Sequence, residues 1–474
     1  MSLCILPASE VAYASIIAGK EAMTLKKGEL PFASLSCFIP RNSVSSEVQV
    51  SQPFRAKAND LPFAFSLFGP VTDGRLLDKL KSAIAVPVIQ KANGDVQYSF
   101  LERHIDAETI AKSIIANILS SAKSRPLTLS SLCFVIPDSY STLKRKALIR
   151  LVRESALNED IQIRLVNQSA AMAASVMKYC SGASNKLFLR IDTEGTTISV
   201  YSMSKVHATP VISVSDSTVI ETDILSATLN ACVKRLERNG FRALLQIVAK
   251  EARQKEFCRY LEVVRRHYAT GEVAEIELDD GAEEEVLAED CDEAVKSALP
   301  SLLNMIENCM LLSDVSMAKI DEIVLSGATM HHPLWREVLK KEYGKEVSVV
   351  SEDEICMSGN QIAASKSPAV AQGTQSAYSV SLGDDAVLCI PSGSSYPCQM
   401  PTKKCSFSYQ SGVSSKDLLV IEQRFCDKQG VVVDRKPLKT IRVSDVYQLG
   451  VTMSIDANGL VLTQVEESAK NSDV

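Results

Sequence analysis

The sequence predicts a layered α/β domain followed by an all-β domain. Two stretches, residues 3–18 and 186–201, are typical of strand, tight turn, strand. Between them, apolar runs at 132–136 and 161–166 are each followed by a segment with helical periodicity, the strand–helix order of an α/β layer. From Tyr378 onward this periodicity gives way to short alternating runs separated by Gly, Asp and Asn, which favours a β-sandwich.

The stretch 186–201 predicts a β-hairpin because its apolar residues alternate on both sides of a short turn. The turn, Asp192-Thr193-Glu194-Gly195, places an acid beside a glycine. Such a turn can bind a phosphate through backbone N–H groups and hold a metal through the carboxylate. The alternative is a purely structural turn.

Helices are predicted where apolar residues recur every three to four positions. Asp106 is an expected N-cap, Gly240 and Gly344 are expected C-terminal stops, and Pro300 is expected near a bend or an early turn. The acidic run 279–293 predicts a solvated loop and a helix start. The predicted helices are 106–121, 141–155, 167–177, 224–239, 242–267, 294–312 and 333–343, and the further strands are 275–278, 321–326, 387–390, 418–421, 431–433, 440–443, 451–455 and 460–465.

The segment 141–155 carries five basic residues: Lys144, Arg145, Lys146, Arg150 and Arg153. Its simplest interpretation is a solvated basic face of a helix. The alternative is a docking surface for an acidic partner or RNA.

Composition narrows the function classes. A chain of 474 residues with a net charge of −6 is long enough for two or three domains, and its charge argues against a global grip on DNA. No apolar run approaches the roughly 18 residues of a membrane span, and the start lacks the basic and apolar regions of a secretory signal. Thirteen scattered cysteines without a C-x-x-C pair indicate a reducing compartment, so a cytoplasmic location is expected. The adjacent His331 and His332 do not converge on one metal, and no metal site is predicted.

Several segments together resemble the 70-kDa heat-shock chaperone family. The most specific match is Ser454-Ile455-Asp456-Ala457-Asn458-Gly459, which is similar to the family's Asp-Ile-Asp-Ala-Asn-Gly turn. The turn 192–197 is similar to its second phosphate loop, Asp-Leu-Gly-Gly-Gly-Thr. Further similar segments are Ile136-Pro137 through 167–173 and Ile320 through Gly327 with Pro333.

The resemblance implies an actin-like, ribonuclease-H-like duplicated nucleotide-binding domain at 1–373, with lobe I at about 1–183 and lobe II at about 184–373. A short polar linker at 374–377 and a β-sandwich substrate-binding-like domain at 378–474 would follow. No helical lid is expected, because the predicted strands run to the end of the sequence. The segment 372–377 has few of the apolar residues with which the family's linker docks on the nucleotide-binding domain. We therefore expect no allosteric coupling between the two domains through this linker.

The departures from the family pattern predict a decayed ATPase. Its first phosphate loop falls on Leu6–Glu10, which loses a metal-side carboxylate and a glycine and adds an anion where phosphate would sit. Phosphoryl transfer depends on metal positioning and charge neutralisation, so combined losses are expected to leave little or no ATP hydrolysis and no catalytic residue. The other departures are Arg55 for the catalytic lysine, Gln168 for the glutamate that orients water, Ser199 for an aspartate, and Ser326, Glu194 and Thr196 for glycines.

Residual nucleotide binding remains an alternative to no cofactor at all. Asp192, Gly195 and Thr197 keep the second loop's pattern, and Gly327 keeps the second glycine of the adenosine pair. The resemblance assigns base and ribose contacts to Glu262, Arg265 and Arg266, against the alternative of an exposed charged helix face. We therefore expect either ATP bound without hydrolysis or no nucleotide.

The resemblance implies a catalytically inactive co-chaperone. Its expected partners are a J-domain protein of the zuotin type, the ribosome, nascent polypeptide and an active chaperone of the same family, with no membrane. The first alternative is a weak but genuine ATP-dependent peptide-binding chaperone with Arg55 and Asp192 carrying residual chemistry. A third candidate is an exchange-factor-like partner, which is disfavoured because the chain lacks the long insertions of such proteins. The last is a sugar-kinase-like enzyme, which would leave the β-domain unexplained.

Overall fold

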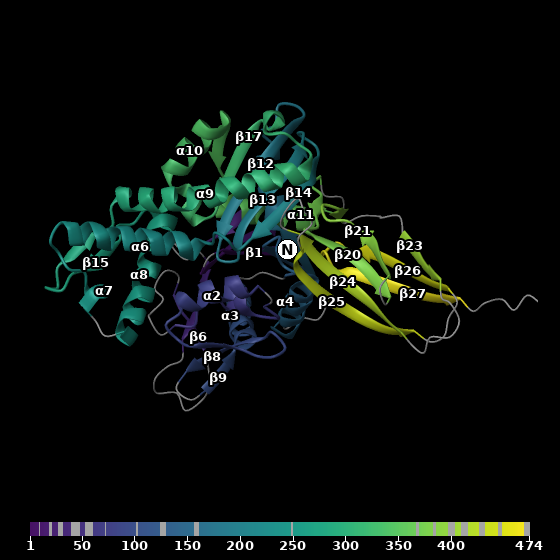
Figure 1. The fold of residues 1–474 in the computed structure, drawn as a ribbon, viewed down its shortest axis with the longest axis horizontal. Helices are drawn as coiled ribbons and strands as arrows, with labels where there is room; N and C mark the ends of the chain where they lie inside the picture. Colours follow the sequence, from purple (N-terminus) through teal and green to yellow (C-terminus); the bar gives the residue numbers. More distant parts are fainter. Residues whose placement is uncertain are drawn as a thin grey trace, which may run out of the picture.

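The computed structural model consists of an α/β body and a group of C-terminal strands at one side of it (Figure 1). It describes residues 1–8, 10–18, 21–26, 32–38, 48–52, 60–71, 73–100, 103–123, 129–155, 161–247, 250–365, 369–382, 385–396, 403–408, 416–425, 432–443 and 448–468. The prediction of a mixed α/β protein followed by antiparallel β-sheets is confirmed.

The first half of the body is built on a sheet in the strand order β11–β10–β1–β2–β3, with β4 attached to β2. β1 runs antiparallel to β2 and parallel to β10, and β10 runs parallel to β11. All seven residues of β1 are buried, which fits a strand paired on both sides and covered on both faces. The strands are β1 (Ser2–Ala8), β2 (Val11–Ala18), β3 (Glu21–Leu25), β4 (Ala33–Ser34), β10 (Ser131–Ile136) and β11 (Gln162–Asn167).

Helices and small strand pairs complete the first half. The predicted helices here are confirmed as α3, α4 and α5, and α2 was not predicted, although the Asp73 side chain caps it by accepting from Leu76 N–H. The helices are α1 (Ala64–Leu67), α2 (Gly74–Ser82), α3 (Ala107–Lys123), α4 (Thr142–Ser155) and α5 (Gln168–Met177). The strands are β5 (Cys37–Phe38), β6 (Gln49–Val50), β7 (Val88–Gln90), β8 (Val96–Phe100) and β9 (Arg103–Asp106).

The second half repeats the plan of the first. Its sheet has the order β14–β13–β12–β17–β18, in which β12 is antiparallel to β13 and parallel to β17. Each sheet thus consists of three successive antiparallel strands, with two parallel strands added beside the first of them. The strands are β12 (Ser184–Asp192), β13 (Gly195–Met203), β14 (Ala208–Asp216), β17 (Glu322–Ser326) and β18 (Glu346–Val349), and the small hairpin β15 (Glu275–Glu277) and β16 (Glu283–Glu285) lies outside the sheet.

The helices of the second half differ from prediction in three places. The segment 242–267 contains α7 and α8, with residues 248–249 outside the described residues, and the acidic run 279–293 includes strand β16. Pro300 lies at an exposed position inside α9, whereas a bend or an early turn was expected there. The helices are α6 (Glu221–Arg238), α7 (Leu244–Ile247), α8 (Lys250–Thr270), α9 (Ala288–Ser313), α10 (Pro333–Tyr343) and α11 (Glu352–Ala364), with short 3₁₀ turns at Met317–Lys319 and Ala328–His331.

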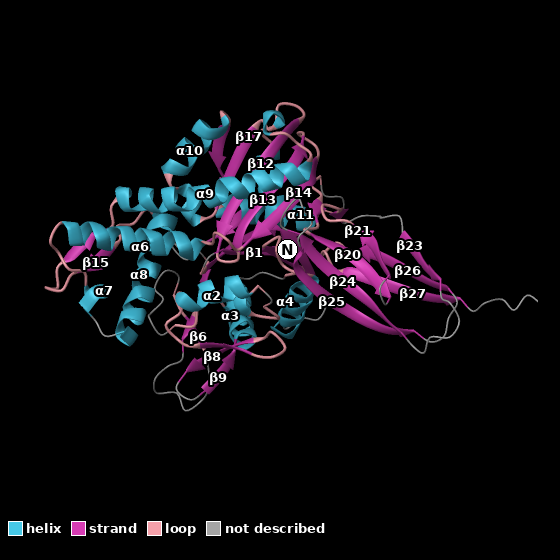
Figure 2. Ribbon diagram, in the orientation of Figure 1, coloured by secondary structure: helices cyan, strands magenta, loops and turns pink. Residues whose placement is uncertain are grey.

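The two halves are joined by helices that pack across the boundary between them. Helix α11 follows the second sheet in sequence but packs on β1, β2 and β10 of the first sheet and on α5. Helix α5 follows the first sheet and also contacts β13 and β14 of the second. Figure 2 shows the strands of the body flanked by helices. This arrangement brings the ends of β1 and β12 toward the same boundary.

The C-terminal region forms two antiparallel sheets that share one apolar core. One sheet has the order β21–β20–β24–β25 and the other β23–β26–β27, and their common core includes Val380, Val420, Val451 and Met453. Residues 432–433 and 440–443, from the two strands predicted at 431–433 and 440–443, belong to one long strand, and residue 431 lies outside the described residues. The bounds are β20 (Ser376–Leu382), β21 (Asp385–Ile390), β23 (Lys403–Ser408), β24 (Lys416–Phe425), β25 (Val432–Val443), β26 (Gln448–Ile455) and β27 (Val461–Ser468), with β19 (Gln372–Gly373) paired to β22 (Ser395–Tyr396).

The segment predicted as a polar linker is buried and bonded to the body. Thr374 and Gln375 are only 6% and 7% exposed. The Gln375 side chain donates to the hydroxyls of Ser213 (2.9 Å) and Ser215 (2.7 Å) on β14. Asn167 at the end of β11 donates to the Gln372 side chain (2.7 Å) and to Gly373 O (3.0 Å). Polar side chains therefore hold this segment in place of the apolar anchors that the sequence lacks.

Two further observations bear on the environment of the chain. No described helix is long and apolar enough to cross a membrane. Ten cysteines whose side chains the structure describes are free thiols, and all ten except Cys258 are buried.

Candidate functional site

The turn between β12 and β13 lies at the boundary of the two halves. Asp192 pairs with Gly195 across the hairpin, and the Asp192 carboxylate accepts a hydrogen bond from Glu194 N–H (2.8 Å). Gly195 has φ +141°, and a Cβ there would lie 2.6 Å from the backbone oxygen of Asp216. The fold therefore requires glycine at position 195 whether or not a phosphate binds.

The Asp192 carboxylate is bound to a cation of the chain itself. Arg190, two residues earlier on the same strand, is 2% exposed and places Nε 3.3 Å from Asp192 Oδ2. Burial raises the pKa of Asp192, and the charge of Arg190 opposes that rise. A metal-side carboxylate in this position is thus already partly neutralised by a guanidinium.

Arg190 extends this ion pair to strand β17. Its Nη1 donates to Ser326 Oγ (2.7 Å) and lies 3.3 Å from the Glu352 carboxylate, which also accepts from Gly327 N–H (3.1 Å). Burial alone would raise the pKa of Glu352, but the hydrogen bond from His331 and the charge of Arg190 outweigh it and lower that pKa to about 2. The result is a buried charged network from the β12–β13 turn to the start of α11.

Glu194, in the same turn, forms a second buried pair. Lys144 Nζ on α4 lies 3.1 Å from both Glu194 carboxylate oxygens and donates to Ser66 O (2.8 Å). The same ammonium lies 4.3 Å from the ring centroid of Tyr140. Burial raises the pKa of Glu194 to about 7, against the lowering effect of Lys144. The pair joins a helix of the first half to the turn of the second.

The counterpart turn of the first half carries Glu10, which is 2% exposed. Its carboxylate accepts from Phe63 N–H (3.0 Å) and from Ser36 Oγ (2.8 Å). Burial raises its pKa to about 8, although the charge of Arg265 and these hydrogen bonds lower it. At neutral pH this side chain is therefore mostly protonated, so the anion predicted at this position is largely neutral.

The residues predicted to clamp the base and ribose lie on α8 and have different environments. Arg265 is 3% exposed, hydrogen-bonds to Glu262, and lies 3.3 Å from the buried carboxylate of Glu221. Its guanidinium also lies 5.6 Å from the Phe63 ring of the first half. Arg266 is more exposed and pairs with Glu272 at 3.1 Å. The interpretation as an exposed charged face is therefore wrong for Glu262 and Arg265, and Arg266 is half-buried.

The remaining predicted residues lie in buried positions near the turn. Thr197 exchanges a hydrogen bond with Ser215 (2.7 Å). Gly327 has φ +104°, and a Cβ would lie 2.2 Å from Ile191 O, so close strand packing alone demands glycine there. Gln168 is 1% exposed, and neither polar atom of its side chain has a hydrogen-bond partner among the described residues. Arg55 lies outside the described residues.

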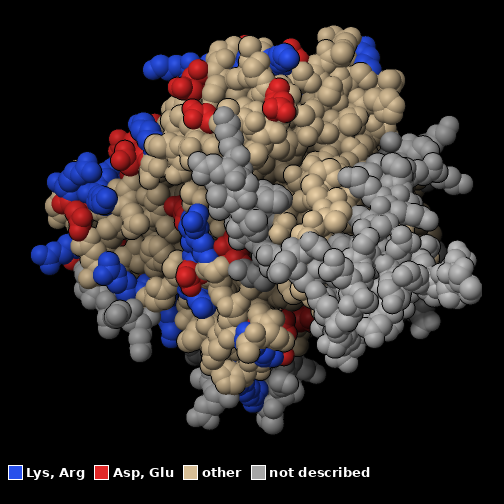
Figure 3. Space-filling model, turned by 45° about the vertical axis from the view of Figure 1, so that its right-hand side comes forward, with Lys and Arg blue, Asp and Glu red and all other residues tan. Residues whose placement is uncertain are grey.

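Sequence reasoning missed Arg190, Glu221 and Glu352, and it named Lys144 only as part of a basic helix face. Arg190 carried a usable signal, because a charged residue in a predicted buried strand needs a partner. Lys144 was placed on a solvated basic face, and that prediction is wrong for Lys144 and Arg145, which are 7% and 5% exposed, while Lys146, Arg150 and Arg153 are exposed. On the face shown in Figure 3, positive and negative side chains are interspersed.

Within the described residues, no group of three or more His, Cys, Asp or Glu side chains could hold a metal ion. His331 lies 3.5 Å from Glu352, and the His332 ring packs near Tyr268. What the arrangement offers chemically is a set of internally paired charges at the boundary between two halves.

No protein-family model matches this chain, and no curated protein matches it at a significant level.

Proposed function

We propose that this chain is a catalytically inactive co-chaperone of the 70-kDa heat-shock chaperone family. In this proposal, residues 1–373 form an actin-like nucleotide-binding-type domain and the C-terminal sheets form the family's β-sandwich. The chain works as a scaffold that orients a J-domain partner of the zuotin type at the ribosome, beside an active chaperone, during folding of nascent polypeptide in the cytoplasm.

The architecture supports the family assignment. The two body sheets share one strand order, as a duplicated domain requires. The turn 456–459, the most specific sequence match, lies where the C-terminal sheets contact the body: Asn458 Oδ1 accepts from Leu165 N–H (3.0 Å), and Asn458 O accepts from Arg145 (3.3 Å).

The observation that carries the inactive assignment is the internal pairing at the phosphate-like turn. A phosphate–metal site needs a free carboxylate and open backbone N–H groups. Here Asp192 is paired with Arg190 and accepts the N–H of Glu194, while the Glu194 side chain binds Lys144. ATP hydrolysis would require breaking these buried pairs, which is costly because each leaves an uncompensated charge.

The first test is a single-turnover ATPase assay on the purified full chain. We expect no hydrolysis above a buffer control. Turnover that disappears in Asp192→Asn would favour the alternative of a weak but genuine ATP-dependent chaperone. Titration calorimetry with ATP and Mg²⁺ then separates bound, unhydrolysed nucleotide from no nucleotide.

The second test is co-purification of the tagged chain from its own cells. A J-domain protein and ribosomes are expected in the eluate, with ribosome association sensitive to loss of the J-domain protein. Recovery of neither would contradict the scaffold role even if the ATPase assay were negative.

A further inference from the structure

Contacts between the two halves of the body extend from the phosphate-like turn to the place where α2 meets the start of α6. We define the seam as five first-half residues that touch the second half across this boundary: Ser66, Lys144, Phe63, Arg75 and Lys79. Their partners are Thr193, Glu194, Arg265, Thr218 and, for Lys79, Thr218 and Asp223.

The inner part of the seam lies at the turn itself. Ser66 Oγ and Thr193 Oγ1 are 3.2 Å apart, and Lys144 bridges Ser66 O and the Glu194 carboxylate. All four side chains are buried. In the family to which the proposed function assigns this chain, a bound phosphate would join the halves at this place. Here Lys144 and Glu194 join them instead.

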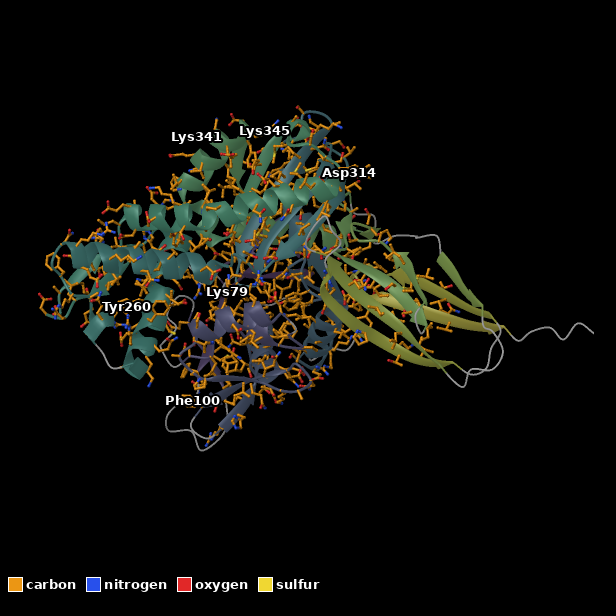
Figure 4. The ribbon with its side chains drawn as sticks, viewed as in Figure 1. Lys79, Phe100, Tyr260, Asp314, Lys341 and Lys345 are labelled. Carbon is orange, nitrogen blue, oxygen red and sulfur yellow. The ribbon has the colours of Figure 1, made fainter. Side chains whose placement is uncertain are left out.

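The outer part of the seam lies between α2 and the start of α6. Lys79 Nζ donates to Thr218 O (2.6 Å) and to Asp223 Oδ2 (2.5 Å), and Arg75 donates to Thr218 Oγ1 (2.7 Å). Figure 4 labels Lys79 where α2 approaches α6. Asp223 also accepts the N–H of Ile220 (2.9 Å) at the helix start, so Lys79 reaches a carboxylate that is already fixed. The N-terminus of α6 is therefore tied to the opposite half.

We infer that the seam keeps the two halves closed without any nucleotide. The reason is that each contact joins a side chain of one half to the other half. In addition, Lys144 and Glu194 form a buried ion pair, and separating the halves would break it and leave each charge without its partner. In a protein that depends on nucleotide for closure, the bound phosphates supply these links. This inference rests on the proposed assignment of 192–197 as a phosphate-like turn, and adds that the scaffold has a single, closed body.

Hydrogen exchange on nucleotide-free protein tests the inference. Peptides covering 60–71, 190–198 and 214–224 report the seam, because they contain Ser66, Glu194 and Thr218, whose contacts cross it. We expect slow exchange there, changed less than about twofold by ATP and Mg²⁺. Exchange that is fast without nucleotide and slowed about tenfold or more by ATP would overturn the inference.

Lys79→Met provides the matched perturbation, because Lys79 is only half-buried and its loss should not prevent folding. It should raise exchange in 214–224 about tenfold while exchange in the C-terminal sheets stays unchanged. Lys81→Met is the control, since Lys81 lies on the same helix and makes no ion pair or hydrogen bond across the seam in the described structure. Equal hydrogen exchange of 214–224 in the two variants would contradict a role for the outer part of the seam.

The outcome is separable from that of the proposed function. If the protein hydrolyses ATP but hydrogen exchange at the seam is slow and unchanged by ATP, the inactive assignment is refuted and the inference of a closed body stands. Fast seam exchange in a protein with no ATPase would do the reverse.

Discussion

The ammonium of Lys144 lies 3.1 Å from both carboxylate oxygens of Glu194, so helix α4 of the first half and the β12–β13 turn of the second share one buried ion pair. The N-terminus of the same helix receives the Glu422 carboxylate from the C-terminal sheets, 3.3 Å from Thr142 N. A carboxylate is favourable there because the helix dipole is positive at that end. Helix α4 therefore contacts all three parts of the molecule.

At pH 9, above the Glu194 pKa of about 7, Lys144→Met should lower the free energy of unfolding by about 3–5 kcal/mol, because it leaves the Glu194 carboxylate buried without its cation. Urea unfolding measures the loss. The double variant Lys144→Met with Glu194→Gln should recover most of it, since both charges are then removed. A double variant as unstable as the single one would show that packing, not charge, dominates at this position.

Glu10→Gln tests the buried carboxyl of the first half through pH. The folded pKa of about 8 lies above the unfolded value of 4.5. The contribution of Glu10 to stability is thus complete below about pH 4.5 and is lost as pH rises through about 8. Relative to wild type, Glu10→Gln should therefore gain stability between about pH 5 and 8, by at most about 1.4 kcal/mol per pH unit.

Chemical unfolding at several pH values measures this trend, with the exposed Glu283→Gln as the control. A flat difference between Glu10→Gln and wild type would mean that the Glu10 carboxyl is ionised in the folded protein across this range.

Arg190→Met should destabilise the second half by about 3–5 kcal/mol, because it strands both Asp192 and Glu352 in a buried site. The pKa of Glu352 should rise from about 2, since the charge of Arg190 helps to lower it. Calorimetric unfolding at two pH values measures both effects. Arg150→Met is the matched control: its ion pair with Glu108 is exposed, and its loss should cost less than about 1 kcal/mol.

Gly459→Ala should loosen the C-terminal sheets from the body. A Cβ at this position would lie 2.9 Å from both Arg145 Nη1 and the Tyr396 hydroxyl, at φ +73°. Limited proteolysis should then cleave near residues 369–376 faster than in wild type. Gly281→Ala separates the two causes, because φ is +83° there but a Cβ meets no atom within 4 Å. Equal effects of the two substitutions would attribute the change to backbone strain alone.

Local pattern sufficed for elements whose residues carry their own signal. The hairpin at 186–201 follows from alternation around Gly195, and α10 begins at Pro333 and ends before Gly344, whose φ is +64°. Strand β16 was missed because three successive glutamates resemble a solvated loop, and α2 was missed because its apolar residues are few.

The sequence by itself determined most of the succession of strands and helices, the two strand–turn–strand units and the shift to β-structure near residue 378, because each depends on residues close together in the chain. Only the tertiary structure decided what the charges do. Arg190 with Glu352 and Lys144 with Glu194 are separated by 162 and 50 residues, and burial makes each cation depend on the carboxylate that the fold brings to it. In the tertiary structure, Lys144, which was predicted on a solvated helix face, and Glu194, in the turn predicted to bind phosphate, form one buried ion pair.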